Sequence, residues 1–230
     1  MVAACLVLTA ATAALDASPS VPASTMSSLM RLSQPWVATS LGSIDPKVLK
    51  LAITAATCAI RSGVVADART LTVIDYSRPS NEERFWVFDL ETHSLLYHEL
   101  VAHGRGSGEL LATTFSNEPG THASSLGLFA TAGAYVGHNG YSLRLNGLDR
   151  GFNDRALERA IVVHGAPYVS PAFVTTRGRL GLSWGCPALR EGVVREIIDR
   201  VKGSGLLFAY YPDSEWLRMS RYLANCDATP

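Results

Sequence analysis

Cys186 lies between Gly185 and Pro187 in the segment GLSWGCPAL, and His164 ends the apolar run AIVVHG upstream of it. A cysteine nucleophile needs a base that takes the thiol proton and backbone amides that stabilise an oxyanion. The apolar run is typical of a strand, so we expect its end to hold His164 rigidly. Gly185 permits a tight turn that aims the amides of residues 184–186 at an oxyanion, since Pro187 has no N–H. These residues predict cysteine-dependent nucleophilic catalysis.

The other cysteines bear on this interpretation. The four cysteines, Cys5, Cys58, Cys186 and Cys226, are scattered singly along the chain. If an N-terminal signal is removed, three remain, and an odd number in an exported protein leaves at least one thiol without a partner in the chain. Cys58 and Cys226 could pair, which would leave Cys186 free. No second cysteine or histidine lies at ligand spacing from Cys186, so no metal site is predicted. The alternative to catalysis is a packing cysteine beside a structural histidine.

The overall composition restricts the classes of function. The 20 basic and 20 acidic residues balance to a formal net charge of zero, so no basic field for nucleic acid is present. A chain of 230 residues can bury a core without a disulfide framework or a metal. The Gly- and Ser-rich stretch 106–127 lacks the Gly-Lys-Ser/Thr ending of a phosphate loop. We therefore expect neither nucleotide binding nor any other cofactor.

The N-terminal region differs in composition from the rest of the chain. Residues 1–15 are small and apolar, contain an Ala-Thr-Ala triplet suited to signal peptidase, and are too few to span a bilayer. Because no basic residues precede them, we interpret them as a signal peptide with a truncated start. The alternatives are a disordered apolar tail and a lipoprotein cleavage box that ends at Cys5. Residues 16–44, rich in Ser, Pro, Ala and Thr, predict a linker. We expect export to the periplasm or cell envelope, without a stable membrane span.

Helical patterns flank and interrupt the region from residue 45 onwards. An N-terminal helix is expected over 45–63, where Asp45 can cap, Pro46 suits the first position and Gly63 offers the stop. Apolar residues recur at helical spacing along it. Further helical patterns are a short one over 153–160 after the potential cap Asn153, one over 191–203, and a C-terminal helix and tail over 213–230.

Between these helices, short β-rich runs predict the fold of the main domain, residues 64–212. They are separated by turn residues and comprise TLTVIDY, RFWVFDL, LLYHELVAH, GLFAT, YSLRL, AIVVHG and LLFAYY. Many short strands with few helices predict a compact, mainly β and mostly antiparallel domain.

The segments VVHGA and SWGCPAL together resemble the His-Gly … Ser-x-Gly-Cys signature of the L,D-transpeptidase (YkuD-like) catalytic domains. The chain is particularly similar to bacterial murein L,D-transpeptidase catalytic domain proteins, through blocks such as VAHGRGSG, SLRLNGL and GFNDRA. The resemblance covers roughly residues 70–211, most of the chain outside the signal and linker. It implies a YkuD-like β-sandwich or distorted barrel with a few flanking helices and a site in a groove near its edge.

The resemblance implies a cysteine acyl transfer on peptidoglycan stem tetrapeptides. Cys186 would be the acylated nucleophile and His164 its base, held by a backbone carbonyl, while Ser183 and Gly185 fill fixed positions of the motif. The thiolate would attack the carbonyl at the L-centre of the third stem residue, and D-Ala would leave. An amine of a neighbouring stem would then resolve the thioester, which gives a 3-3 crosslink. Carbapenems are the expected acylating inhibitors.

Other residues near the motif are candidates for substrate binding. We expect Trp184, Arg179, Tyr141 and His103 to contact the substrate. Packing beside a turn, strand packing and a structural histidine are the alternatives for Trp184, Tyr141 and His103 respectively.

One position departs from the family pattern. Many members carry Arg two positions after the cysteine, whereas this chain has Ala188. Arg177, Arg179 or Arg190 are the residues that could supply the charge instead. The departure leaves the acyl donor and acceptor open, including another stem, a lipoprotein, a free D-amino acid or water. The competing functions are a cell-wall cysteine peptidase or carboxypeptidase that acts on stem peptides, and a non-catalytic peptidoglycan-binding β-domain.

Overall fold

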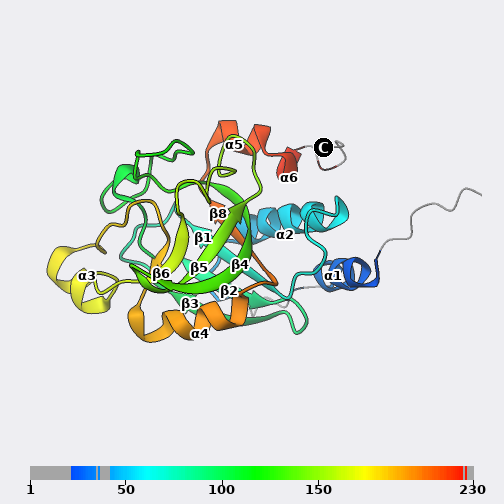
Figure 1. Ribbon diagram of the computed structural model, residues 1–230, viewed down its shortest axis with the longest axis horizontal. Coiled ribbons are helices and arrows are strands. Elements are labelled where there is room, and N and C mark those ends of the chain that lie inside the picture. The colour runs from blue at the N-terminus through cyan, green and yellow to red at the C-terminus, as the bar shows by residue number, and fades with distance from the viewer. Residues whose placement is uncertain (1–21, 35, 37–41, 225, 227–230) are drawn as a thin grey trace, which may run out of the picture.

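Eight strands form one mixed sheet, in the order β3-β2-β1-β8-β4-β5-β6-β7, in the computed structural model, which describes residues 22–34, 36, 42–224 and 226 (Figure 1). Neighbouring strands are antiparallel except for the parallel pairs β1 with β8 and β6 with β7. The strands are β1 (Thr70–Asp75), β2 (Phe85–Asp89), β3 (Ser94–Glu99), β4 (Gly127–Gly137), β5 (Gly140–Gly147), β6 (Val162–Gly165), β7 (Ala188–Leu189) and β8 (Gly205–Tyr210). The predicted mainly β fold is confirmed.

The two ends of this sheet nearly meet. An isolated antiparallel bridge pairs Ala102, just beyond β3, with Ala188 in β7, and the Ala102 N–H donates to the Ala188 carbonyl at 2.9 Å. A second bridge pairs Gly104 with Ser183. The sheet therefore curls into an almost closed barrel, which confirms the expected distorted barrel. Closure places the segment that follows β3 against the segment that contains Cys186.

The helices flank the barrel (Figure 1). They are α1 (Ala23–Ser33), α2 (Pro46–Arg61), α3 (Pro171–Arg177), α4 (Glu191–Val201), α5 (Ser214–Met219) and α6 (Arg221–Ala224), with a 3-10 turn η2 (Arg105–Ser107). Helix α2 begins as the sequence predicts, since the Asp45 carboxylate accepts the Lys47 N–H at 2.8 Å and Pro46 is the first helical residue. Its buried face carries several alanines, whose small side chains let the helix approach β1, β4 and β8 closely.

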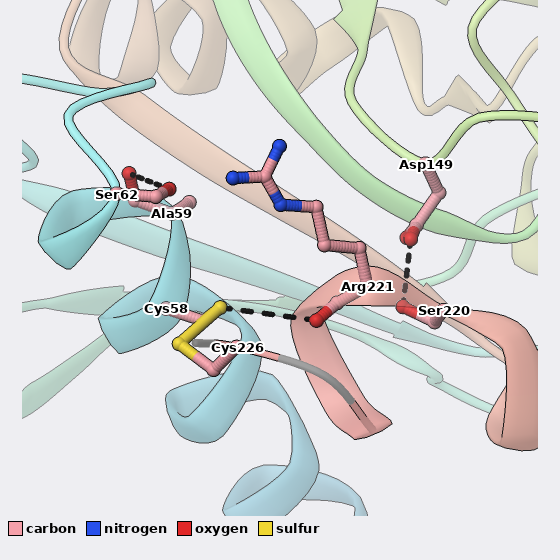
Figure 2. Close-up of a disulfide and its surroundings, with 7 residues drawn as sticks. All are labelled: Cys58, Ala59, Ser62, Asp149, Ser220, Arg221 and Cys226. Atoms are coloured by element: carbon pink, nitrogen blue, oxygen red, sulfur yellow. Dashed lines mark hydrogen bonds between the residues drawn. A yellow bond between two sulfur atoms is a disulfide. The ribbon is translucent and has the colours of Figure 1, made fainter. Parts of the chain in front are cut away.

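A disulfide joins Cys58 in α2 to Cys226, beyond α6, with Cα atoms 5.3 Å apart (Figure 2). The pairing that the sequence left open is thus present. Nearby, the Ser220 hydroxyl between α5 and α6 donates to Asp149 at 2.6 Å. The disulfide and this hydrogen bond hold the C-terminal helices against α2 and against the turn that contains Asp149. Cys186 is the free cysteine of the described part of the chain.

Residues 153–160 form successive turns, so the helix predicted there is absent. The Asn153 side chain is fully buried and donates to the Leu128 carbonyl at 3.0 Å. The Arg155 N–H donates to the side-chain oxygen of Asn117 at 3.2 Å instead of to the carbonyl four residues earlier. The Arg159 N–H still donates to the Arg155 carbonyl at 2.9 Å, but the contacts of Asn153 and Arg155 with distant segments interrupt the series of local hydrogen bonds that a helix needs.

The N-terminal and C-terminal segments also differ in detail from the sequence pattern. Helix α1 lies inside the stretch 16–44, and its Ser28 hydroxyl donates to Asp67 at 2.8 Å. The helical pattern within 213–230 is divided into α5 and α6 at Ser220. The expected signal peptide, with Cys5, lies outside the described residues. Among the residues that the structure describes, no helix combines the length and the apolar character needed to cross a bilayer.

Candidate active site

Cys186 and His164 line one cavity of about 270 Å³ at the edge formed by β6 and β7. His164 lies in β6, and its register partner in the parallel strand β7 is Ala188, two residues beyond the cysteine. The parallel pairing therefore brings the predicted nucleophile and base to the same place. His138, Tyr168, Ser183 and Trp184 are among the other lining residues.

The Cys186 sulfur is held by backbone groups. The side chain is only 8% exposed. The Val162 N–H donates to Sγ at 3.4 Å, and Sγ lies 3.7 Å from the Ala160 carbonyl, which can accept the thiol proton. Within the described residues, no hydrogen bond joins Sγ to the His164 ring. A thiol-to-imidazole hydrogen bond therefore requires the thiol proton to leave the Ala160 carbonyl. Catalytic hydrogen bonds that are long or absent in a free enzyme commonly form when substrate binds.

The His164 ring is oriented by its own strand. Its Nδ1 lies 2.9 Å from the Gly165 carbonyl. Because a carbonyl only accepts, Nδ1 carries a proton, and in the neutral ring Nε2 is then the acceptor. Burial lowers the pKa of His164, partly opposed by the Gly165 hydrogen bond, so the neutral form is favoured. The ring is thus prepared to accept a proton.

The pKa of the Cys186 thiol is raised by burial, while the Val162 N–H and the Arg159 guanidinium act in the opposite direction. The resting pair is therefore a neutral thiol beside a neutral imidazole. The chemistry that this pair supports is general-base activation of the thiol during attack rather than a preformed thiolate.

Hydrogen bonds inside the cysteine loop fix its shape. The Ser183 hydroxyl donates to the Cys186 carbonyl at 2.6 Å and accepts the Gly185 N–H at 3.2 Å. Gly185 has φ +111°, a conformation that disfavours any other residue, and a side chain there would lie 2.8 Å from the Ala123 carbonyl. The Gly185 amide, expected from the sequence as an oxyanion donor, is therefore engaged within the loop.

Ser124 is a contributor that the sequence analysis missed. Its hydroxyl donates to the Gly185 carbonyl at 3.1 Å and accepts the Gly104 N–H at 3.0 Å. A trans peptide directs its C=O and N–H to opposite sides, so this bond turns the Cys186 N–H away from Ser124. That N–H has no partner among the described residues. It is the free amide adjacent to the sulfur that an oxyanion could use.

The sequence matches the family model of the L,D-transpeptidase catalytic domain over residues 41–210. The chain belongs to this family. The match spans most of the chain, including the whole barrel, Cys186 and His164.

Several solved structures are similar to parts of this L,D-transpeptidase chain at low identity. An L,D-transpeptidase from Mycobacterium smegmatis is 14% identical, with TM-score 0.39, over 63% of this chain and 60% of that one. The L,D-transpeptidase LdtMt1, solved in complex with imipenem, is 14% identical, with TM-score 0.38 and the same two coverages. The helical cell shape determining protein Pgp2 from Campylobacter jejuni is 10% identical, with TM-score 0.39, over 63% and 48%. The chain thus spans about half to three fifths of their length. No curated protein sequence matches.

His103 of this L,D-transpeptidase domain is fully buried behind the cysteine loop and does not line the cavity. Its Nδ1 accepts from Arg84 at 2.7 Å, and Nε2 donates to the Gly108 carbonyl at 3.1 Å. Burial and the Arg84 charge lower the pKa of His103 to about 4, so its ring stays neutral. The His103 carbonyl accepts the Ser183 N–H at 3.0 Å, which ties the residue to the loop.

The other expected substrate contacts fall in different places. Trp184 lines the cavity, is 70% exposed, and stacks on His122 with ring centroids 5.0 Å apart. The Tyr141 hydroxyl donates to Asp199 on α4 at 2.6 Å. Arg179 forms an ion pair with Glu109. Neither Tyr141 nor Arg179 lines the cavity.

The arginines considered as substitutes for the family residue do not reach the site either. Ala188 is fully buried in the closing bridge and packs in a small apolar cluster with residues such as Ala102 and Leu180, which leaves no room for an arginine side chain. Arg190 is paired with Glu99 at 2.7 Å. Arg177 is the last residue of α3, and neither Arg177 nor Arg190 lines the cavity.

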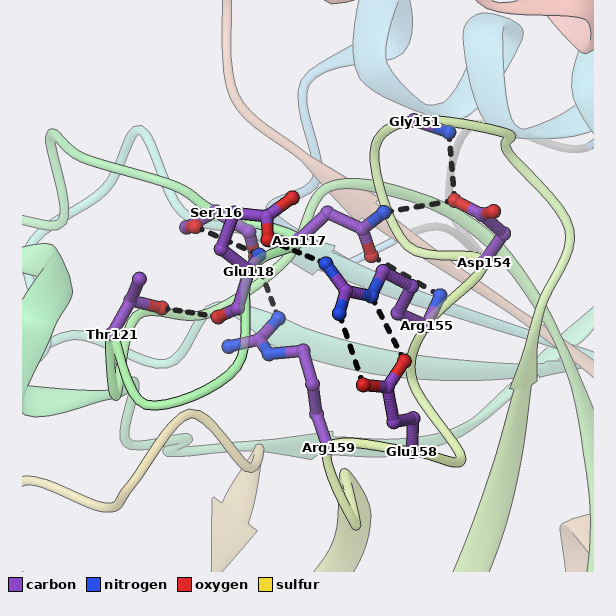
Figure 3. A network of polar contacts seen from close by, with 9 residues as sticks. All are labelled: Ser116, Asn117, Glu118, Thr121, Gly151, Asp154, Arg155, Glu158 and Arg159. Carbon is purple, nitrogen blue, oxygen red and sulfur yellow. Dashed lines mark hydrogen bonds and ion pairs between the residues drawn. The ribbon is translucent and has the colours of Figure 1, made fainter.

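Arg159 is the cation that acts on Cys186 from behind the loop. Its guanidinium donates to the Ser116 carbonyl at 2.6 Å and to the Ala123 carbonyl at 2.6 Å. Beside it, Arg155 forms ion pairs with Glu118 and Glu158 (Figure 3). The network fixes the loop against which Gly185 packs. Sequence patterning could not single out Arg159, because its role depends on contacts with residues far away in the chain.

Proposed function

We propose that this protein is an exported peptidoglycan L,D-transpeptidase that transfers an acyl group from a stem tetrapeptide to an amine through Cys186. The observation that carries the proposal is that the unpaired Cys186 thiol and the His164 ring line one cavity in a chain of this family. The Cys58–Cys226 disulfide supports a location outside the cytoplasm, because such bonds persist in oxidising compartments.

In the acylation step, His164 Nε2 takes the thiol proton as Sγ attacks the carbonyl carbon of the third stem residue. The free Cys186 N–H stabilises the oxyanion that develops on the carbonyl oxygen. Collapse of this intermediate breaks the amide bond to D-Ala, and His164 returns the proton to the departing amine. The product is a thioester on Cys186 and free D-Ala.

In the second step, an acceptor amine attacks the thioester carbonyl. A C–N bond forms and the C–S bond breaks, while His164 takes the amine proton and returns a proton to the Cys186 sulfur. With the side-chain amine of a neighbouring stem as acceptor, the product is a 3-3 crosslink. Trp184 extends the cavity wall outward and provides an exposed aromatic surface for the stem.

Intact mass after incubation with imipenem tests the proposal. We expect the wild-type protein to gain the mass of one drug molecule and Cys186→Ala to gain none, because the acylated atom is removed. The matched control is His164→Gln, which keeps the thiol and should acylate about 10²- to 10⁴-fold more slowly. An adduct retained by Cys186→Ala would contradict the proposal. A folded wild type that forms no adduct and resists iodoacetamide would favour the packing cysteine of a non-catalytic domain.

A further inference from the structure

A second cavity, of about 370 Å³, also borders His164. It shares His138, Asn139, His164 and Tyr168 with the cavity that contains the sulfur, so the two are neighbours that meet at this histidine. Cys186 lines only the first cavity, whereas Glu191 lines only the second. The proposed general base therefore borders two cavities, and the two cavities differ in charge.

The packing of α4 on β6 places Glu191 beside the base. Glu191 is the first residue of α4, and Gly165 follows His164 at the end of β6. A methyl group on Gly165 would lie 2.8 Å from Val194 Cγ1 and 3.4 Å from Glu191 Cα. The absence of a side chain at Gly165 thus permits the helix to approach, and Glu191 Cγ lies 3.5 Å from the position that such a methyl group would take.

The carboxylate of Glu191 has no ion-pair partner among the described residues. The neighbouring cation, Arg190, is bound by Glu99 at 2.7 Å and 2.5 Å. The other lining groups, His138, Asn139 and Tyr168, bring imidazole, amide and phenol but no second carboxylate. The second cavity therefore carries one uncompensated negative charge and groups that can hydrogen-bond a polar ligand.

We propose that the second cavity receives the acyl acceptor, and that Glu191 selects acceptors whose amine arrives as an ammonium ion. This inference rests on the proposed function and names the binding site for its second step. The ammonium is attracted by Glu191, loses one proton to neutral His164, and the resulting amine attacks the Cys186 thioester carbonyl. The C–N bond forms and the C–S bond breaks, His164 passes its proton to sulfur, and the nitrogen releases its second proton to solvent, which leaves a neutral amide. Donor and acceptor thereby meet at one base.

Separate measurement of the two half-reactions tests this. The first is the rate of acylation by imipenem, and the second is the KM for acceptor amine with a stem tetrapeptide as donor. We expect Glu191→Gln to acylate at the wild-type rate and to raise the KM of a cationic alkylamine acceptor about three- to fivefold, the range for a solvent-exposed ion pair. Glu191→Lys should raise it further. The increase should shrink at high salt, because exposed charges are screened.

Two controls make the test specific for charge recognition. Hydroxylamine is uncharged at neutral pH, so its resolution of the acyl-enzyme should not respond to Glu191→Gln. Glu196→Gln changes a carboxylate on the same helix that lies outside both cavities and accepts from Tyr97. It should change neither the KM of the cationic acceptor nor the reaction with hydroxylamine. Equal KM values for the cationic acceptor in the wild type and Glu191→Lys would overturn the inference alone. A wild-type protein that imipenem does not acylate would instead overturn the proposed function.

Discussion

The sulfur of Cys186 and the sulfurs of Cys58 and Cys226 belong to opposite regions of the molecule, and they are held in opposite ways. Cys58 is in a helix of the core and is covalently bound to the C-terminal segment (Figure 2). Cys186 is buried nearly as well, but within the described ranges its sulfur has only the Val162 N–H and the Ala160 carbonyl as polar partners. One region uses sulfur to restrict the chain, whereas the other keeps a reduced thiol within a cavity.

Under the proposed function, burial alone does not distinguish the structural cysteine from the nucleophile. The surroundings of Cys186 include an oriented imidazole, a free amide and a cation behind the loop. The surroundings of Cys58 are the alanine-rich face of α2 and the segment after α6. The two regions should therefore respond to substitution in different quantities, stability in one and acylation rate in the other.

Removal of the disulfide is expected to have the largest effect on stability. Cys58→Ala combined with Cys226→Ala should lower the free energy of unfolding by about 2–5 kcal/mol, because the unfolded chain loses a long-range crosslink. Imipenem acylation of Cys186 below the melting transition should stay at the wild-type rate. Urea unfolding and intact mass measure the two quantities. The comparison would fail if Cys186→Ala lowered the stability by as much as the double variant does.

Ser124→Ala should affect the reactive region alone. We expect imipenem acylation to slow about 10- to 100-fold, because the Cys186 N–H is no longer oriented as an oxyanion donor. Alkylation of Cys186 by iodoacetamide forms no oxyanion and should keep its rate. Ser28→Ala is the matched control, since that buried hydroxyl donates to Asp67 at 2.8 Å and not to the cysteine loop. If both reactions slowed equally, the serine would act on the thiol or on the loop as a whole.

The smallest expected effect concerns a second contrast, between the histidines. His164 lines the cavity, whereas His103 is sealed behind the loop with a pKa lowered to about 4 by burial and Arg84. The folded protein keeps His103 neutral while the unfolded chain binds a proton below about pH 6.5, so stability is lost as the pH falls from there towards 4. Compared with His103→Gln, the wild type should lose on the order of 1–2 kcal/mol more between about pH 7 and about pH 5.

Glutamine suits this test because its amide can accept from Arg84 and donate to the Gly108 carbonyl without titrating. Urea unfolding at the two pH values gives the difference directly. Equal losses in the two proteins would mean that His103 is protonated in the folded state at a more ordinary pH.

Much of the fold follows from local patterns in the sequence. The buried run at β1, the cap at Asp45 and the strand end at His164 each depend on residues close together in the chain, so periodicity and capping predict them. The turns at 153–160 do not, because Asn117 and Leu128 supply hydrogen bonds from distant segments. Helix propensity depends on neighbouring residues alone, so it could not predict those long-range hydrogen bonds.

The sequence by itself determined the residue types on which the proposed chemistry rests: a cysteine that follows a glycine, a histidine at a strand end, and the residues that resemble the family. Tertiary structure alone decided which groups surround them. The parallel pairing of β6 with β7 brings Cys186 beside His164, and barrel closure brings Ser124 to the Gly185 carbonyl. It also sends His103, Tyr141 and Arg179 away from the cavity. The reason is physical: residue types carry reactivity, whereas strand register and long-range hydrogen bonds set the distances at which it can act.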